Sequence, residues 1–186
     1  MTPVSATEPK RAVDFLLEAN ALERVPRAGF VMCGVKSPEN VAAHTSGMAI
    51  AALLIADRMT EPIDRGRLLT LALLHDIGES RTGDVALIEK TAADREAEER
   101  ATAEMLEGLP AHYAAAVAEY EAQETLEARI VKAADKVQMM AKILAYEADG
   151  NGDLAAFWRN PRNFYDAGLP EAKALFDEIR ARHDEA

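Results

Sequence analysis

The chain has 186 residues, 49% of them hydrophobic, so it is long enough for one domain with a buried core. It carries 21 Lys and Arg against 32 Asp and Glu, and this net charge of -11 argues against binding to a nucleic-acid polymer, which needs clustered positive charge. The apolar runs are far shorter than the roughly 20 residues of a membrane-spanning helix, so we expect no membrane insertion.

The cellular compartment is indicated by two weaker features. The single cysteine, Cys33, cannot form an intrachain disulfide and fits a reducing environment. Residues 1–11 are polar and contain no apolar stretch typical of a signal peptide. We therefore expect a cytoplasmic protein.

The residue pattern predicts an all-α fold, a compact single domain over residues 1–186, because Ala, Leu and Glu are abundant and no stretch alternates as a strand does. The first helix is expected from Pro9 to Leu22, with Thr7 as its candidate cap. Residues 23–37 are expected to form a long connection. Ser37-Pro38 has the sequence of a cap followed by a first-turn proline, which predicts a second helix to about Arg58.

The middle of the chain predicts three further helices. One begins at Asp64 and continues toward Gly78, followed by a loop over residues 83–93. A highly charged helix is expected over Asp94–Leu109, and Pro110 starts the next one.

The longest helical pattern covers Thr125 to Ala148. Apolar residues recur there at helical spacing, so this helix is predicted to be central. A turn over residues 149–153 follows, and the last helix is expected from Pro170 to about the end of the chain.

Four polar residues interrupt apolar helix faces. His75 continues an apolar stripe and is followed directly by Asp76, while His44 and Asp135 lie on apolar faces of two other helices. Taken singly, such residues are more often hydrogen-bonded core histidines or paired aspartates. Together, two imidazoles and two carboxylates form a donor set that suits one divalent ion such as Mn, Co, Fe, Zn or Mg.

Other charged residues lie close to this set in the sequence. Glu79 follows His75 by one helical turn, and Asp84 lies in the next loop, so both are expected near the same site. The following three cations could help to neutralise a bound anion, but we expect them to be solvated surface charges: Arg81, Lys90 and Lys132.

The order His44, His75-Asp76, Asp135 resembles that of the HD-domain superfamily of metal-dependent phosphohydrolases. Five longer motifs resemble the HD-domain 5′-deoxynucleotidases, and the likeness covers about residues 22–147. These motifs are Arg24–Phe30, Pro38–His44, Ala72–Glu79, Thr82–Asp84 and Val131–Lys136. Because the five motifs occur in the family's order, the likeness is far more specific than a His-Asp dipeptide alone.

The resemblance implies an enzyme that hydrolyses deoxyribonucleoside 5′-monophosphates to deoxynucleosides and phosphate. It implies that His44, His75, Asp76 and Asp135 are the metal ligands, that Glu79 and Asp84 are the catalytic acids, and that Arg27 binds substrate near its phosphate. Phe30 stands where the family has tryptophan; it is assigned to substrate binding as well, although it lacks the indole N–H donor.

The resemblance also implies a metal-binding core over about residues 22–147 with a helical extension over about 150–186. Proteins of this kind commonly form homodimers, and either the charged helix or the C-terminal helix could supply the contact surface. Two alternatives stay open: an HD hydrolase of another nucleotide phosphoester, and an inactive nucleotide-binding or regulatory module. The presence of all four ligand positions and both acids disfavours the inactive module.

Overall fold

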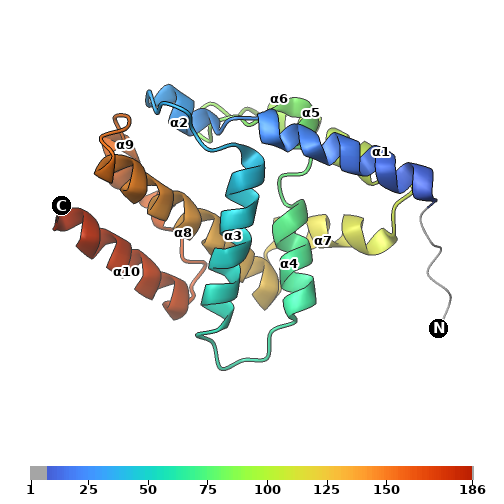
Figure 1. Ribbon diagram of the computed structural model, residues 1–186. Helices are drawn as coiled ribbons and strands as arrows, with labels where there is room; N and C mark the ends of the chain where they lie inside the picture. The colour runs from blue at the N-terminus through green and yellow to red at the C-terminus, as the bar shows by residue number, and fades with distance from the viewer. Residues whose placement is uncertain (1–7, 186) are drawn as a thin grey trace.

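A computed structural model, which describes residues 8–185, shows helices packed around one long helix, α8 (Leu126–Ala148) (Figure 1). Within the described residues, the only β feature is an isolated bridge between Pro26 and Asn40. The all-α prediction is therefore confirmed. The other elements are α1 (Pro9–Ala19), η1 (Asn20–Arg24), α2 (Ala28–Met32), α3 (Val41–Ala56), α4 (Arg65–Leu74), α5 (Glu79–Thr82), α6 (Ala92–Leu106), α7 (Ala111–Ala122), α9 (Ala155–Arg159), η2 (Pro161–Phe164) and α10 (Pro170–Asp184).

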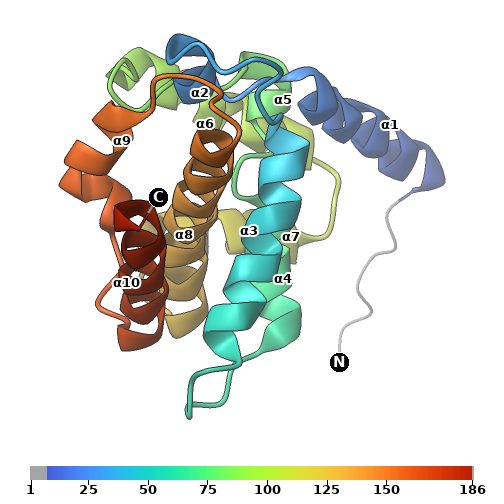
Figure 2. The same cartoon turned by 60° about the vertical axis from the view of Figure 1, so that its left-hand side comes forward.

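Helix α8 is central, as its sequence pattern predicts. It contacts α3, α4, α7 and α10, and both views show α3 and α10 beside it (Figures 1 and 2). Ile130, Val131 and Met140 of α8 are fully buried and belong to the main core cluster. Phe176 of α10 belongs to the same cluster, so the last helix contributes to one continuous core. None of the helices in residues 8–185 has the length and apolar character needed to cross a bilayer.

A second, smaller core cluster supports the turn that follows α4. It consists of Leu22, Val41, Ile77 and Met105, contributed by η1, α3, this turn and α6. Ile77 is the only one of the four that belongs to the turn, and it is 3% exposed. Burial of this side chain anchors the turn between the packed helices.

Side-chain caps fix several helix starts. Asn40 accepts a hydrogen bond from the backbone of Ala43 at 2.8 Å and caps α3. The helix therefore begins at Val41 and not at Pro38, and Ser37 adopts a left-handed φ of 54°. A capping box between Thr91 and Asp94 starts α6 at Ala92, so Asp94 is the third helical residue.

Three further expectations need correction. The first helix ends at Ala19, and its predicted last residues form the 3-10 helix η1. The predicted cap Thr7 lies outside the described residues. The connection over 23–37 contains the short helix α2, and residues 155–164, which belong to the expected helical extension but had no element assigned, contain α9 and η2. These elements have five residues or fewer, too few to show a helical period in the sequence.

Candidate metal centre and active site

A tight turn after α4 places the His-Asp pair. The helix predicted to continue to Gly78 ends at Leu74, where the backbone changes to i to i−3 hydrogen bonds: Ile77 N–H donates to Leu74 O at 3.2 Å, and Glu79 N–H donates to Asp76 O at 3.1 Å. A Cβ at Gly78 would lie 2.9 Å from the carbonyl oxygen of Glu98, so glycine is needed for the close approach of α6.

The side chains that the sequence predicts as ligands meet where α3, α8 and this turn come together. His44 and His75 have ring centroids 5.6 Å apart. His75 Nε2 lies 2.9 Å from Asp76 Oδ2, and His44 Nε2 lies 4.0 Å from the same oxygen. Asp135 of α8 brings Oδ1 to 3.4 Å from His44 Nε2. One atom from each of His44, His75 and Asp76 lies within 4.8 Å of the others, a spacing that one ion can bridge.

Hydrogen bonds at Nδ1 favour the same tautomer in both imidazoles. His75 Nδ1 is 2.8 Å from the carbonyl oxygen of Ala72, and His44 Nδ1 is 2.6 Å from the Gln138 side-chain oxygen. Because both partners are acceptors, each Nδ1 carries the proton and each Nε2 of a neutral ring keeps a lone pair. Neither Nε2 has a hydrogen-bond partner in residues 8–185. Two buried, unpartnered lone pairs beside two carboxylates fit a divalent cation.

The charges around the cluster favour ionised aspartates. Despite the burial of the ring, Asp76 raises the pKa of His75, so a proton and a cation compete for Nε2. Burial opposes ionisation of Asp76, but the positive charge of a protonated His75 and that of Arg27 outweigh it and hold the pKa of Asp76 well below its usual range. At Asp135 the positive charge of Lys136, whose Nζ lies 3.0 Å from Oδ2, outweighs burial, so the pKa of Asp135 is also lowered. Two anionic carboxylates in a buried site supply the negative charge that a cation requires.

A cavity of about 810 Å³ opens beside the cluster. His75, Asp76 and Asp135 line it together with Glu79 and Asp84, so both predicted acids lie next to the predicted ligands. This volume falls within the range of small-molecule sites.

The two acids differ in their environment. Glu79 is 3% exposed and its Oε2 has no hydrogen-bond partner in the described part of the chain. Burial, with Asp76 and Asp84 nearby, raises the pKa of Glu79 to about 10, so in this state it is protonated at neutral pH. In contrast, Asp84 accepts a hydrogen bond from the backbone of Ala28 and lies 3.5 Å from Arg27 Nη1.

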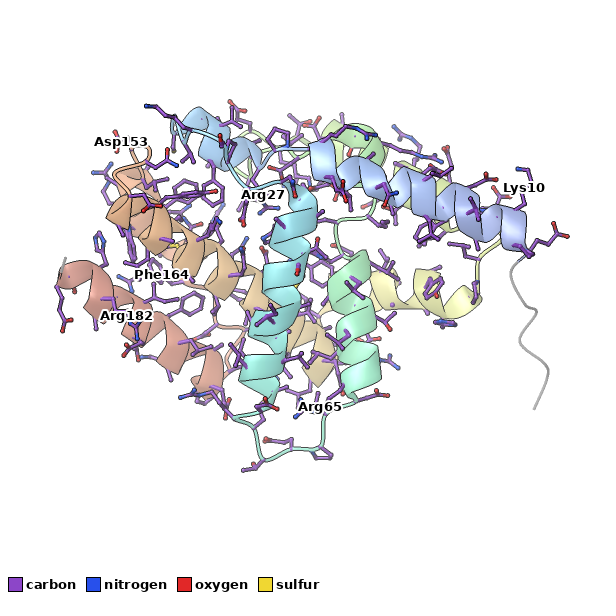
Figure 3. The ribbon with its side chains drawn as sticks, viewed as in Figure 1. Lys10, Arg27, Arg65, Asp153, Phe164 and Arg182 are labelled. Atoms are coloured by element: carbon purple, nitrogen blue, oxygen red, sulfur yellow. The ribbon has the colours of Figure 1, made fainter. Side chains whose placement is uncertain are left out.

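Arg27 links the two halves of the site. Its Nη1 lies 3.4 Å from Asp76 Oδ2 as well as 3.5 Å from Asp84 Oδ1, and the side chain lines the cavity. Figure 3 shows Arg27 near the N-terminal end of α3. A guanidinium held between two carboxylates is preoriented, and its other N–H donors can bind an anion in the cavity.

Two cations differ from expectation. Lys90 and Lys132 line the cavity and are not simply solvated: Lys90 pairs with Glu98, and Lys132 Nζ donates to the Tyr120 hydroxyl at 3.1 Å. Arg81 does lie outside the cavity lining and pairs with the surface carboxylates Glu18 and Glu104. A sequence pattern could not separate these cases, because only packing shows which side of a helix or loop faces the cavity.

Phe30 is a core residue at the cavity wall. Its ring is 2% exposed and packs edge-on against Tyr146 and tilted against Phe157, at centroid distances of 5.3 and 5.6 Å. Phe30 also belongs to the cavity lining. A role in substrate binding stays a prediction.

Sequence reasoning missed residues that support the cluster without belonging to it. Gln138 contacts His44, and Glu39 contacts Gln138. The Tyr120 ring packs against His75 with centroids 5.4 Å apart. Gln138 follows Asp135 by three residues and so shares its helix face, which was the one available signal.

Comparison with known proteins gives consistent results. A family model described as HD domain matches residues 19–171. The 5′-deoxynucleotidase HDDC2 of Bos taurus is 32% identical over 94% of this chain and 87% of its own length. A conserved hypothetical protein from Pyrococcus furiosus has a TM-score of 0.74 and 31% identity, covering 92% of this chain and 99% of its own.

A further solved structure carries a functional description in its name. It is named a predicted metal-dependent phosphohydrolase from Magnetospirillum magnetotacticum, and it has a TM-score of 0.70, 28% identity and 98% coverage of both chains. With the family model matching most of the chain, the resemblance seen in the sequence is confirmed. The chain belongs to the HD-domain family and is related to the 5′-deoxynucleotidases.

Proposed function

We propose that this protein is a metal-dependent phosphohydrolase that converts deoxyribonucleoside 5′-monophosphates to deoxynucleosides and phosphate. The observation that carries the proposal is the pair of unpartnered imidazole Nε2 atoms of His44 and His75 beside Asp76 and Asp135. His75 and the two aspartates line a cavity that Glu79 also lines. Relatives named 5′-deoxynucleotidase support the choice of substrate.

The metal is one divalent ion held by His44, His75, Asp76 and Asp135. The mixed N/O donor set suits Mn, Co, Fe, Zn or Mg and does not select among them. A divalent cation there supplies positive charge that acidifies water and attracts phosphate oxygens.

In this proposal the chain's own residues bind the phosphate and move one proton. Arg27 donates hydrogen bonds to the phosphate, with Lys90 and Lys132 as further positive charge in the cavity. Glu79, with its unpartnered oxygen, accepts a proton from the attacking water and passes it to the 5′ oxygen as the P–O5′ bond breaks. Asp84 is a positioning residue, because both of its oxygens are occupied by Arg27 and Ala28.

The electrostatics of Glu79 fit a proton carrier. Its pKa of about 10 reflects burial and the negative charges of Asp76 and Asp84. Positive charge placed beside Asp76 offsets part of this repulsion and brings the pKa of Glu79 toward neutrality, where a group can both take up and release a proton.

The test is phosphate release from deoxyribo- and ribonucleoside 5′-monophosphates. The protein is stripped of metal and then given Mn, Co, Fe, Zn or Mg separately. We expect release from the deoxynucleotides with at least one metal and none from the stripped protein. If nucleotides bind but no phosphate is released with any of the metals, the inactive module is favoured. If phosphate is released only from other phosphoesters, the substrate must be reassigned.

Partner and location are also part of the proposal. We place the protein in the cytoplasm, as a homodimer whose substrate is a free nucleotide and not a nucleic-acid polymer. The net charge of -11 supports the last point. Light scattering coupled to size-exclusion chromatography measures the oligomeric state directly, and a monomer mass would contradict the dimer.

A further inference from the structure

The two ligand histidines are oriented by different kinds of acceptor. His75 Nδ1 donates to a backbone carbonyl, that of Ala72, which can only accept a hydrogen bond. His44 Nδ1 instead meets the side-chain amide of Gln138 at 2.6 Å. An amide end carries both an acceptor oxygen and a donor NH₂ group, and the two exchange places when it rotates by half a turn.

The orientation of this amide decides the chemistry of His44. With the oxygen of Gln138 toward Nδ1, the His44 proton lies on Nδ1 and Nε2 keeps its lone pair. With the NH₂ group there, the proton would have to move to Nε2. A protonated Nε2 cannot bind a metal, and it is this atom that faces Asp76 and Asp135 at 4.0 and 3.4 Å.

Glu39 fixes the amide in the first orientation. Gln138 Nε2 lies 3.0 Å from Oε2 and 3.3 Å from Oε1 of Glu39. An ionised carboxylate only accepts, so the NH₂ group must point to Glu39 and the oxygen to His44. Glu39 is 9% exposed, and a buried charge of this kind binds its donors strongly.

The surrounding backbone holds Glu39 and leaves room for Gln138. The N–H of Glu39 donates to the Tyr146 hydroxyl at 2.7 Å, and its carbonyl accepts from Arg27 N–H at 3.0 Å. At Gly47 a Cβ would lie 3.0 Å from Gln138 Cγ and 3.1 Å from Nε2. A side chain at position 47 would therefore crowd the amide.

We propose that Gln138, oriented by Glu39, is a positioning residue that holds His44 with its Nε2 lone pair free for the metal. The inference rests on the metal role proposed for His44. Glu39 acts through Gln138, since its carboxylate lies no closer than 4.0 Å to the His44 ring nitrogen. The negative charge of Glu39 polarises the Gln138 amide, and this also makes His44 a better electron donor to the metal.

Cobalt binding tests the inference without any measurement of activity. Metal-stripped full-length protein is titrated with Co²⁺, and binding is followed by calorimetry and by the visible spectrum of the ion. We expect Gln138→Leu to weaken binding by about 10- to 100-fold, as loss of such supporting hydrogen bonds typically does. Glu39→Gln should weaken Co²⁺ binding less, because the amide of the introduced glutamine can still accept a hydrogen bond from Gln138 in one of its two orientations.

A double variant separates a direct role of Glu39 from one through Gln138. If Glu39 acts through Gln138, the Gln138→Leu/Glu39→Gln chain binds Co²⁺ no more weakly than Gln138→Leu alone. Additive losses would overturn this part of the inference. The matched control is Asn163→Leu, which removes another buried amide that donates to Phe157 O at 2.9 Å and should leave Co²⁺ affinity unchanged.

The outcomes distinguish this inference from the metal proposal. If wild-type protein binds no Co²⁺, or His44→Ala binds it equally well, the metal role of His44 is wrong. If His44→Ala binds weakly but Gln138→Leu binds like wild type, only the positioning role is wrong. If Gln138→Leu does not fold, Gln138→Asn is used instead. The shorter asparagine side chain cannot reach both His44 and Glu39, so the same loss of Co²⁺ affinity is expected. Wild-type affinity of this variant would again contradict the positioning role.

Discussion

The ligand side and the acid side of the site are built differently. His44 and Asp135 lie within the long helices α3 and α8, whereas Glu79 and Asp84 belong to the four-residue α5 and the loop after it. On the ligand side each imidazole is fixed by a hydrogen bond at Nδ1, while Glu79 keeps an unpartnered oxygen among residues 8–185. Long packed helices and the anchored turn at residues 75–78 thus hold the groups that must stay fixed, and a short element holds the group that must gain and lose a proton.

The largest effect is expected from breaking the ligand side. His75→Ala removes an Nε2 donor, and His44 with the two carboxylates should bind the cation much more weakly, so phosphate release should fall to the level of the metal-stripped protein. Metal content and release are measured together, with helix content from circular dichroism. The same substitution at the exposed His112 is the control. Full activity of a metal-free His75→Ala chain would contradict the site.

Breaking the acid side should separate chemistry from metal binding. Glu79→Gln keeps the size of the side chain but cannot take a proton, so kcat should fall by about 10²–10⁴-fold with metal affinity unchanged. Glu96→Gln on the exposed face of α6 serves as the control. Retention of the wild-type kcat by Glu79→Gln would remove Glu79 from the mechanism.

A smaller effect should appear in the stability of the metal-free protein. The pKa of Glu79 is raised from 4.5 to about 10 on folding, so the folded state binds the extra proton between these values. The stabilisation is fully present below the unfolded pKa and is lost as pH rises toward 10, with a slope of at most about 1.4 kcal/mol per pH unit. Denaturant unfolding across this range should show a steeper decline for wild type than for Glu79→Gln. Parallel curves would contradict the raised pKa.

Periodic features of the sequence predicted the framework well. The pattern over Thr125–Ala148 predicted a central helix, and α8 covers Leu126–Ala148, with Thr125 as its cap, and packs against α3, α4, α7 and α10. His44 and Asp135 interrupted apolar faces, and the structure buries both. These predictions succeeded because a helix repeats every 3.6 residues, so a stripe of apolar side chains already marks the buried face.

Features without a period were missed or misplaced. The turn at residues 75–78 was predicted as helix because Leu71 to Leu74 continues smoothly into His75, and only the packing of α6 against Gly78 shows the break. The start of α3 was placed at Ser37-Pro38, whereas Asn40 supplies the cap. In both cases a neighbour distant in sequence chose between locally acceptable conformations.

The sequence by itself determined the helical class, the central helix and the residues whose chemistry suits a cation, because burial pattern and side-chain type are local properties. Tertiary structure alone decided that Gln138 and Glu39 orient His44, that Arg27 joins Asp76 to Asp84, and that Lys90 and Lys132 face the cavity. Those relations join residues far apart in the chain. They depend on how helices pack and on which lone pairs that packing leaves without a partner.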